Sequence, residues 1–249
     1  MPDAGTVPRP SAAGRYARWT GLLTGLVGAR QIEAHDDLGV GILNAISVFG
    51  LCAVAGVLVG DALAPRPRGT VRRAGHTPRR VRDYLPRRMT LVLLVQAGAL
   101  VVLLAVAAWV ASPDGLGRAG RALTMRCPDG SVTRTGPWPG SHYDLPILAA
   151  LAVSTGACVW FLTRIARHPG EEQARHDRAL VIVAAWGLLV SAHLLGTATT
   201  ACDALMDMDC GGAAGNLANW VLWPTAIVAL GTVAWCGFTV VSHKARVPR

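Results

Sequence analysis

His193 is the residue of this sequence best placed to do chemistry. Apart from cysteine thiols, it is the only ionisable side chain within the five longest apolar runs of the chain. An imidazole can move a proton or bind a metal near neutral pH, and an ionisable group inside hydrocarbon usually serves a function. A catalytic histidine needs an orienting partner, however, and we expect no carboxylate at the depth of His193.

Polar residues from the other apolar runs are predicted to lie near His193. At a rise of about 1.5 Å per residue, they and His193 all lie roughly 9 to 13 Å below the outer boundary of their runs. Thr197 shares a helix face with His193, four residues further on. Together these positions predict a polar pocket open to the outside, formed by Asn44, Ser47, Ser154, His193, Thr197 and Thr225. The alternative is that His193 forms a hydrogen bond with a serine or threonine of another helix, which would hold the two helices together.

Three cysteines are predicted to lie at or beyond the outer boundary, in an oxidising compartment: Cys127, Cys202 and Cys210. Either Cys202–Cys210 or Cys127–Cys210 could form a disulfide, and the sequence does not choose between them. The segment 202–210 also holds three carboxylates and two thioethers, a mixture that indicates no particular metal. We therefore predict no metal and no cofactor.

The elements that carry these residues are predicted to be membrane-spanning helices. The apolar runs cover residues 38–60, 90–112, 145–163, 179–201 and 217–241, and none contains Asp, Glu, Lys or Arg. A helix needs about 20 apolar residues to cross a bilayer, and in lipid every backbone polar group must be paired within the segment. The sequence predicts an all-α fold, a polytopic membrane helix bundle of five spans over residues 38–241.

The arginines predict an orientation in a bacterial cytoplasmic membrane. Nine arginines lie in residues 65–89, four in 164–178, and three basic residues in the tail 242–249, which places these segments inside. Five spans then put the C-terminus in the cytoplasm and the N-terminus outside. The loop Arg66–Arg88 is expected to attract anionic lipid headgroups, so the net charge of +9 implies no nucleic acid.

Residues 1–37 conflict with an outside location because they contain Arg9, Arg15, Arg18 and Arg30. An interfacial helix is the first interpretation, with an apolar face of Trp19, Leu22, Leu23, Leu26 and Val27. A cleaved signal peptide and disorder are the alternatives, and the segment is expected to be too short and too interrupted for a sixth span. Further on, Gly56-x-x-x-Gly60 predicts close helix packing, within the bundle or in a dimer.

Two segments beside the spans have distinctive sequences. Val81–Arg88 is expected to anchor at the headgroups, and Gly136–Tyr143 is a rigid turn that could present Trp138, His142 and Tyr143 as an outer lid or partner surface. Together they resemble a group of uncharacterised multi-pass membrane proteins of high-GC actinobacteria. The resemblance covers the first to the third span and implies no activity.

No complete catalytic or cofactor motif is present in the sequence. We therefore expect a non-enzymatic membrane protein that acts as an accessory, sensor or assembly partner, with a protein partner or a second copy of itself. The alternatives are a small transporter or permease component that uses the pocket around His193, and a membrane enzyme that uses His193 or the outer cysteines.

Overall fold

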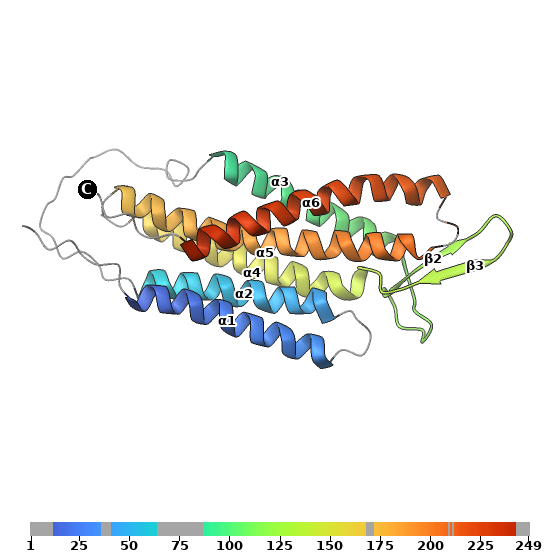
Figure 1. Cartoon of the computed structure of the whole chain (residues 1–249), viewed down its shortest axis with the longest axis horizontal. Helices are drawn as coiled ribbons and strands as arrows, with labels where there is room; N and C mark the ends of the chain where they lie inside the picture. Colours follow the sequence, from blue (N-terminus) through green and yellow to red (C-terminus); the bar gives the residue numbers. More distant parts are fainter. Residues whose placement is uncertain are drawn as a thin grey trace, which may run out of the picture.

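Helices make up most of the chain. The computed structural model describes residues 12–35, 41–63, 87–167, 172–208, 210 and 212–242. Their helices lie side by side along one axis (Figure 1): α1 Ala12–His35, α2 Gly41–Ala62, α3 Arg87–Val110, α4 Ser141–Arg167, α5 Glu172–Met206 and α6 Gly212–Ser242. The loop of arginines that the sequence assigned to headgroups lies outside the described residues, except for Arg87 and Arg88, which begin α3.

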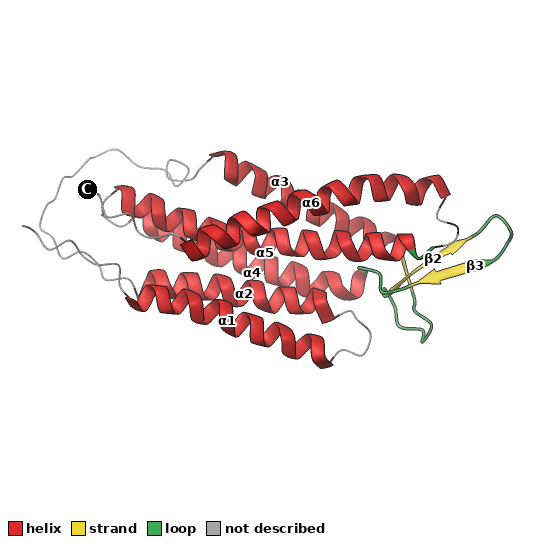
Figure 2. Cartoon of the chain, viewed as in Figure 1, coloured by secondary structure: helices red, strands yellow, loops and turns green. Residues whose placement is uncertain are grey.

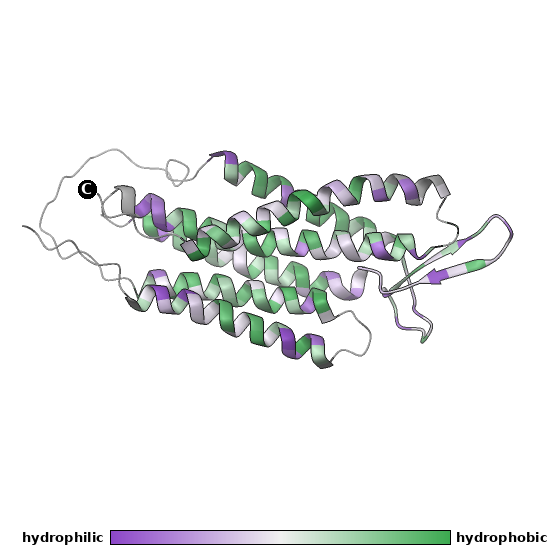
Figure 3. Ribbon diagram, in the orientation of Figure 1, coloured by the Kyte–Doolittle hydropathy of each residue, from purple (hydrophilic) through white to green (hydrophobic). Residues whose placement is uncertain are grey.

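Five of these helices are long and apolar enough to cross a membrane, as predicted. They are α2 to α6, over Gly41–Ala62, Arg87–Val110, Ser141–Arg167, Arg175–Met206 and Ala218–Ser242. Large apolar side chains are exposed on the bundle, among them Val95 and Trp109 of α3 and Phe238 of α6. Figure 3 shows that hydrophobic residues predominate along the helices. Such a surface is unfavourable in water but suits contact with lipid chains. These helices indicate a multi-pass membrane protein.

Helix α5 is the centre of the bundle. In the most apolar part of α5, 78% of the residues are buried. In the corresponding parts of α2, α3, α4 and α6, only 22% to 50% of the residues are buried. Helix α5 packs against α2, α3, α4 and α6. Small residues allow this close approach: a Cβ added at Gly187 would lie 2.8 Å from Leu93 Cδ1 of α3 and 2.9 Å from Cys236 Sγ of α6.

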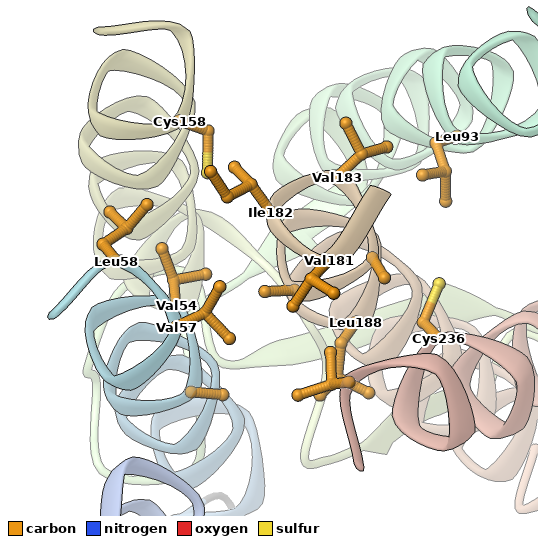
Figure 4. Packing of buried hydrophobic residues seen from close by; sticks show 14 of the residues in the cluster. Val54, Val57, Leu58, Leu93, Cys158, Val181, Ile182, Val183, Leu188 and Cys236 are labelled. Atoms are coloured by element: carbon orange, nitrogen blue, oxygen red, sulfur yellow. The ribbon is translucent and has the colours of Figure 1, made fainter. Parts of the chain in front are cut away.

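The core around α5 is apolar and joins four of the other helices. Figure 4 shows Val181, Ile182 and Leu188 of α5 between side chains of neighbouring helices. These neighbours are Val54, Val57 and Leu58 of α2, Leu93 of α3, Cys158 of α4 and Cys236 of α6. Membrane helices gain stability chiefly from such van der Waals packing, because lipid is as apolar as the core.

A small antiparallel sheet covers one end of the bundle, which we call the sheet end (Figure 2). Its strands are β1 Ala111–Ser112, β2 Ala122–Arg126 and β3 Val132–Thr135, in the order β1-β2-β3, with Ser112 opposite Ala122 and Leu123 opposite Thr135. The sequence predicted only a long loop ending in a rigid turn. Strands of two to five residues are too short to show an alternating pattern that can be distinguished from loop composition.

The helices also extend beyond the predicted apolar runs. Helix α5 continues through Cys202 and Asp203 to Met206, and α6 begins at Gly212, so the predicted outer loop 202–216 is much shorter than expected. The sequence boundary was drawn where apolar residues end. A helix can continue past that point, since nothing in Cys202–Met206 breaks it.

Residues 12–35 of the N-terminal extension form a helix, α1. Helix α1 lies lengthwise against α2 and antiparallel to it (Figure 1). The first turn of α1 therefore lies at the end of the bundle opposite the sheet. We call this the basic end, because Arg87 and Arg88 of α3, Arg164 and Arg167 of α4 and Arg175 and Arg178 of α5 also lie there.

Candidate functional site

His193 and Ser47 form a buried hydrogen-bonded pair between α5 and α2. Both are buried, His193 with 1% of its surface exposed. His193 Nδ1 lies 2.8 Å from the carbonyl oxygen of Leu189, one turn earlier in α5, so it carries the proton and donates it. Nε2 of the neutral ring is then the acceptor and receives the hydroxyl of Ser47 at 2.8 Å. Both ring nitrogens are engaged.

A second buried polar cluster joins three helices, and sequence reasoning missed it. Gln96 of α3 donates from Nε2 to Thr232 Oγ1 of α6 at 2.7 Å, and its Oε1 accepts from Ser191 Oγ of α5 at 2.9 Å. Gln96 is 4% exposed. The signal was present, because an amide inside an apolar run must also find partners, but the predicted pocket included only polar residues near the depth of His193.

The other residues of the predicted pocket do not contact His193 through hydrogen bonds in the described part of the chain. Ser154 of α4 is buried and donates to Leu151 O at 3.0 Å. Thr225 of α6 donates to Val221 O at 2.8 Å. Asn44 is half-buried on α2. These contacts favour the interhelical hydrogen bond over a pocket lined by four helices.

Thr197 and Asp144 are exceptions to this pattern. Thr197 is fully buried, and its Oγ1 has no hydrogen-bond partner among the described residues. The same is true of Asp144 Oδ1, in the first turn of α4, whose residue is 9% exposed. The sequence placed Asp144 in the outer loop, so its burial was not foreseen.

Helix register places these two residues at one level. Trp186 Nε1 of α5 donates to Thr155 Oγ1 of α4 at 2.9 Å, and the two helices are antiparallel. Moving 11 residues toward the sheet end leads from Trp186 to Thr197 (197 − 186) and from Thr155 to Asp144 (155 − 144). Asp144 and Thr197 thus lie at the same depth, one turn beyond His193.

Residues 111–140, which hold the three strands, form a cap at the sheet end. A disulfide joins Cys127, next to β2, to Cys210, before α6; Cys202 is a free thiol buried in α5. Of the two pairings that the sequence left open, the structure has Cys127–Cys210. In the β2–β3 turn, hydrogen bonds from the hydroxyl and backbone N–H of Ser131 lower the pKa of the Asp129 carboxyl.

The turn Gly136–Tyr143 packs inward. Trp138 is 6% exposed and donates from Nε1 to Ala107 O of α3 at 2.9 Å, and Tyr143 is 2% exposed. Gly140 allows the turn, because an added Cβ would lie 2.5 Å from the Gly120 carbonyl oxygen. Trp138 and Tyr143 therefore cannot serve as the free lid or partner surface that the sequence suggested. His142 is exposed and contacts Arg121, with His142 Nε2 2.8 Å from Arg121 Nη2.

Comparison with known proteins gives no family for this chain. No protein-family model, curated protein or solved structure matches it. No group of three or more potential metal-binding His, Cys, Asp or Glu side chains occurs in the described part of the chain.

Proposed function

We propose that this chain is a non-enzymatic accessory protein of the bacterial cytoplasmic membrane that acts through a protein partner bound at the cap. The observation that supports this role is the contrast between the interior and the cap. The side chains of His193 and Gln96 hydrogen-bond to groups of other helices and are only 1% and 4% exposed, so a substrate has no access to them in this packing. The cap, in contrast, extends beyond the helix ends (Figure 1).

The exposed surface of the cap fits an acidic partner. Leu116 is 77% exposed and Val132 58% exposed, which gives two apolar contact points. Residues 113–136 contain four arginines (Arg118, Arg121, Arg126 and Arg134) and two aspartates (Asp114 and Asp129). Strand β3 is an edge of the sheet, and such an edge can accept a strand from another protein.

Crosslinking in living cells tests the proposal. A photoreactive amino acid would replace Val132 or Leu116 in the cap, and Val153 on the outer surface of α4 would serve as the matched control, since it is 65% exposed. We expect both cap positions to give an adduct of the same mass that Val153 does not give. An adduct of twice the chain mass would identify the partner as a second copy. Adducts from Val153 alone, or none from the cap, would refute the proposal.

The orientation belongs to the same proposal: the basic end faces the cytoplasm and the cap faces outward. The positive-inside tendency supports it. Arg87, Arg88, Arg164, Arg167, Arg175 and Arg178 lie at the basic end, and the loop 65–89 that precedes α3 is arginine-rich. The disulfide of the cap fits an oxidising compartment.

A second candidate function, a small transporter component, is favoured by one observation. Asp144 Oδ1 and Thr197 Oγ1 are buried at one level without partners in the described residues. A carboxylate and a hydroxyl are oxygen ligands that a small cation or a proton could use. If the chain is a transporter component, replacing Asp144 by Asn should abolish uptake of the cation or proton. The same replacement should leave crosslinking at the cap unchanged.

A further inference from the structure

Helix α1 is packed against α2 along almost its whole length. One face of α1 carries Gly14, Ala17, Gly21, Gly25 and Gly28, at spacings of three and four residues. A Cβ added at Gly21 would lie 2.7 Å from both Cys52 O and Gly56 Cα, so the two backbones touch there.

The contact extends in both directions from that crossing point. Toward the basic end, a Cβ at Gly60 would lie 2.8 Å from Gly14 O, and toward the sheet end a Cβ at Gly28 would lie 3.1 Å from Val48 Cγ1. From Gly14 to Gly28 this is a distance of about 21 Å along the helix axis. Gly56-x-x-x-Gly60, which the sequence could assign to the bundle or to a dimer, faces α1 of the same chain.

A helix in this position must enter the same layer as α2, which is one of the five helices suited to cross a membrane. Helix α1 has 24 residues and is therefore about 36 Å long, compared with a hydrocarbon thickness of about 30 Å. An interfacial helix would lie across the end of the bundle, not along α2.

The outward face of α1 is apolar. Tyr16, Trp19, Leu23, Leu26 and Val27 are 45% to 66% exposed and recur every three or four residues. No described element covers this stripe, and the exposed apolar surface of the bundle continues beside it, as at Val59 of α2. Acyl chains are the partner that fits an apolar stripe continuous with lipid-facing helices.

The charges of α1 lie at its two ends. Residues 19–29 contain no Asp, Glu, Lys or Arg. Near the sheet end, Arg30 pairs with Glu33 at 3.7 Å. At the basic end, Arg18 is close enough to interact with Asp61 of α2, and Asp61 pairs with Arg178 of α5 at 3.7 Å. Arg18 thus has an opposite charge beside it at the bundle end.

We infer that α1 is a sixth membrane-crossing helix, with its outward stripe in lipid and its N-terminus on the same side as the basic end and the C-terminus. This revises the expectation of an external N-terminus. It also places Arg15 and Arg18 of α1 at the basic end with the other arginines, whereas Arg30 stays near the sheet end, where it pairs with Glu33. The inference rests on the membrane setting of the proposed function and not on a partner at the cap.

Labelling of single introduced cysteines tests the inference on the full chain in cells. Ala4→Cys lies before α1 and Asp37→Cys lies between α1 and α2; Ser131→Cys in the cap and Ala245→Cys in the tail mark the two sides. The probe is a membrane-impermeant maleimide, applied before and after permeabilisation. The unsubstituted chain gives the background.

We expect Asp37→Cys to react in intact cells like Ser131→Cys, and Ala4→Cys to react only after permeabilisation like Ala245→Cys. Reaction of Ala4→Cys in intact cells would overturn the inference and favour an interfacial α1. Loss of residue 4 from the mature chain would also overturn it, because the segment would then be a cleaved signal. If Ser131 and Ala245 label on exchanged sides, the proposed orientation fails, while the position of Ala4 relative to Asp37 still tests the sixth crossing.

Discussion

At the scale of single residues, the interior of this protein uses polar side chains to hold helices together. Ser47 and His193 join α2 to α5, and Gln96 joins α3 to α5 and α6. An isolated polar group in hydrocarbon is unfavourable, so each bond also specifies which helices pack together.

Replacing Ser47 by Ala should destabilise the protein. The change leaves Nε2 of His193 buried without a donor, and the expected loss is roughly 0.5 to 1.5 kcal/mol of unfolding free energy. Thermal unfolding in detergent measures it. Thr225→Val is the control, because within the described residues that hydroxyl bonds only to its own helix, at Val221 O. Equal melting temperatures for the Ser47 variant and the parent would show that the pair contributes nothing.

Replacing Asp144 by Asn should have the opposite effect. The buried carboxyl has an oxygen without a partner in the described chain, and a neutral amide avoids burying a charge. We expect a gain of about 1 kcal/mol or more at pH 8. A lower melting temperature would mean that the carboxylate has a stabilising contact that its geometry does not show.

At the scale of elements, the tight contact between α1 and α2 predicts that alanine destabilises the protein at Gly56 of α2. At Gly98 of α3, outside this contact, alanine is expected to have the opposite effect. A Cβ at Gly56 would lie 2.8 Å from Ala17 O and Gly21 Cα, both backbone atoms. Gly56→Ala must therefore separate the helices, and overpacking of this kind typically destabilises by about 1 to 3 kcal/mol.

Gly98→Ala is the matched control on α3, where an added Cβ has open space around it. Alanine in an exposed helix position should stabilise by about 0.5 to 1 kcal/mol. Unfolding of the two variants in detergent should thus shift in opposite directions. A common shift would indicate that α1 does not pack on α2.

The sequence predicted the five long apolar helices because twenty charge-free residues leave few alternatives to a membrane helix. It missed α1 as a packed helix, since its central uncharged run spans only residues 19–29 and is rich in glycine and threonine. Its packing depends on the Gly21–Gly56 contact, which is visible only in three dimensions. The sequence partly predicted the Ser47–His193 pair, because both residues lie at a similar depth below the outer boundary. The direction in which Ser154 and Thr225 point depends on the rotation of each helix about its axis, which depth does not specify.

At the scale of the whole molecule, one disulfide joins the cap to the loop between the last two helices. The chain has six cysteines, and four of them are free: Cys52, Cys158, Cys202 and Cys236. After denaturation without a reductant, we expect a maleimide mass tag to add four times, and six times after reduction. Mass spectrometry of the intact chain measures both.

Cys202→Ser separates the two pairings that the sequence allowed. With Cys127 joined to Cys210, the five cysteines of this variant should give three tags before reduction (5 − 2) and five afterwards. Five tags before reduction would show that Cys202 takes part in the bond.

The connection between Cys127 and Cys210 also orders the events of biogenesis. The two residues are 83 positions apart, and the whole of α4 and α5 is translated between them. The bond cannot close until the ribosome has made α5 and Cys210 has come to lie beside Cys127. Oxidation of Cys127 and Cys210 is therefore a late step in folding. It occurs only in chains whose central helix, α5, is already in position.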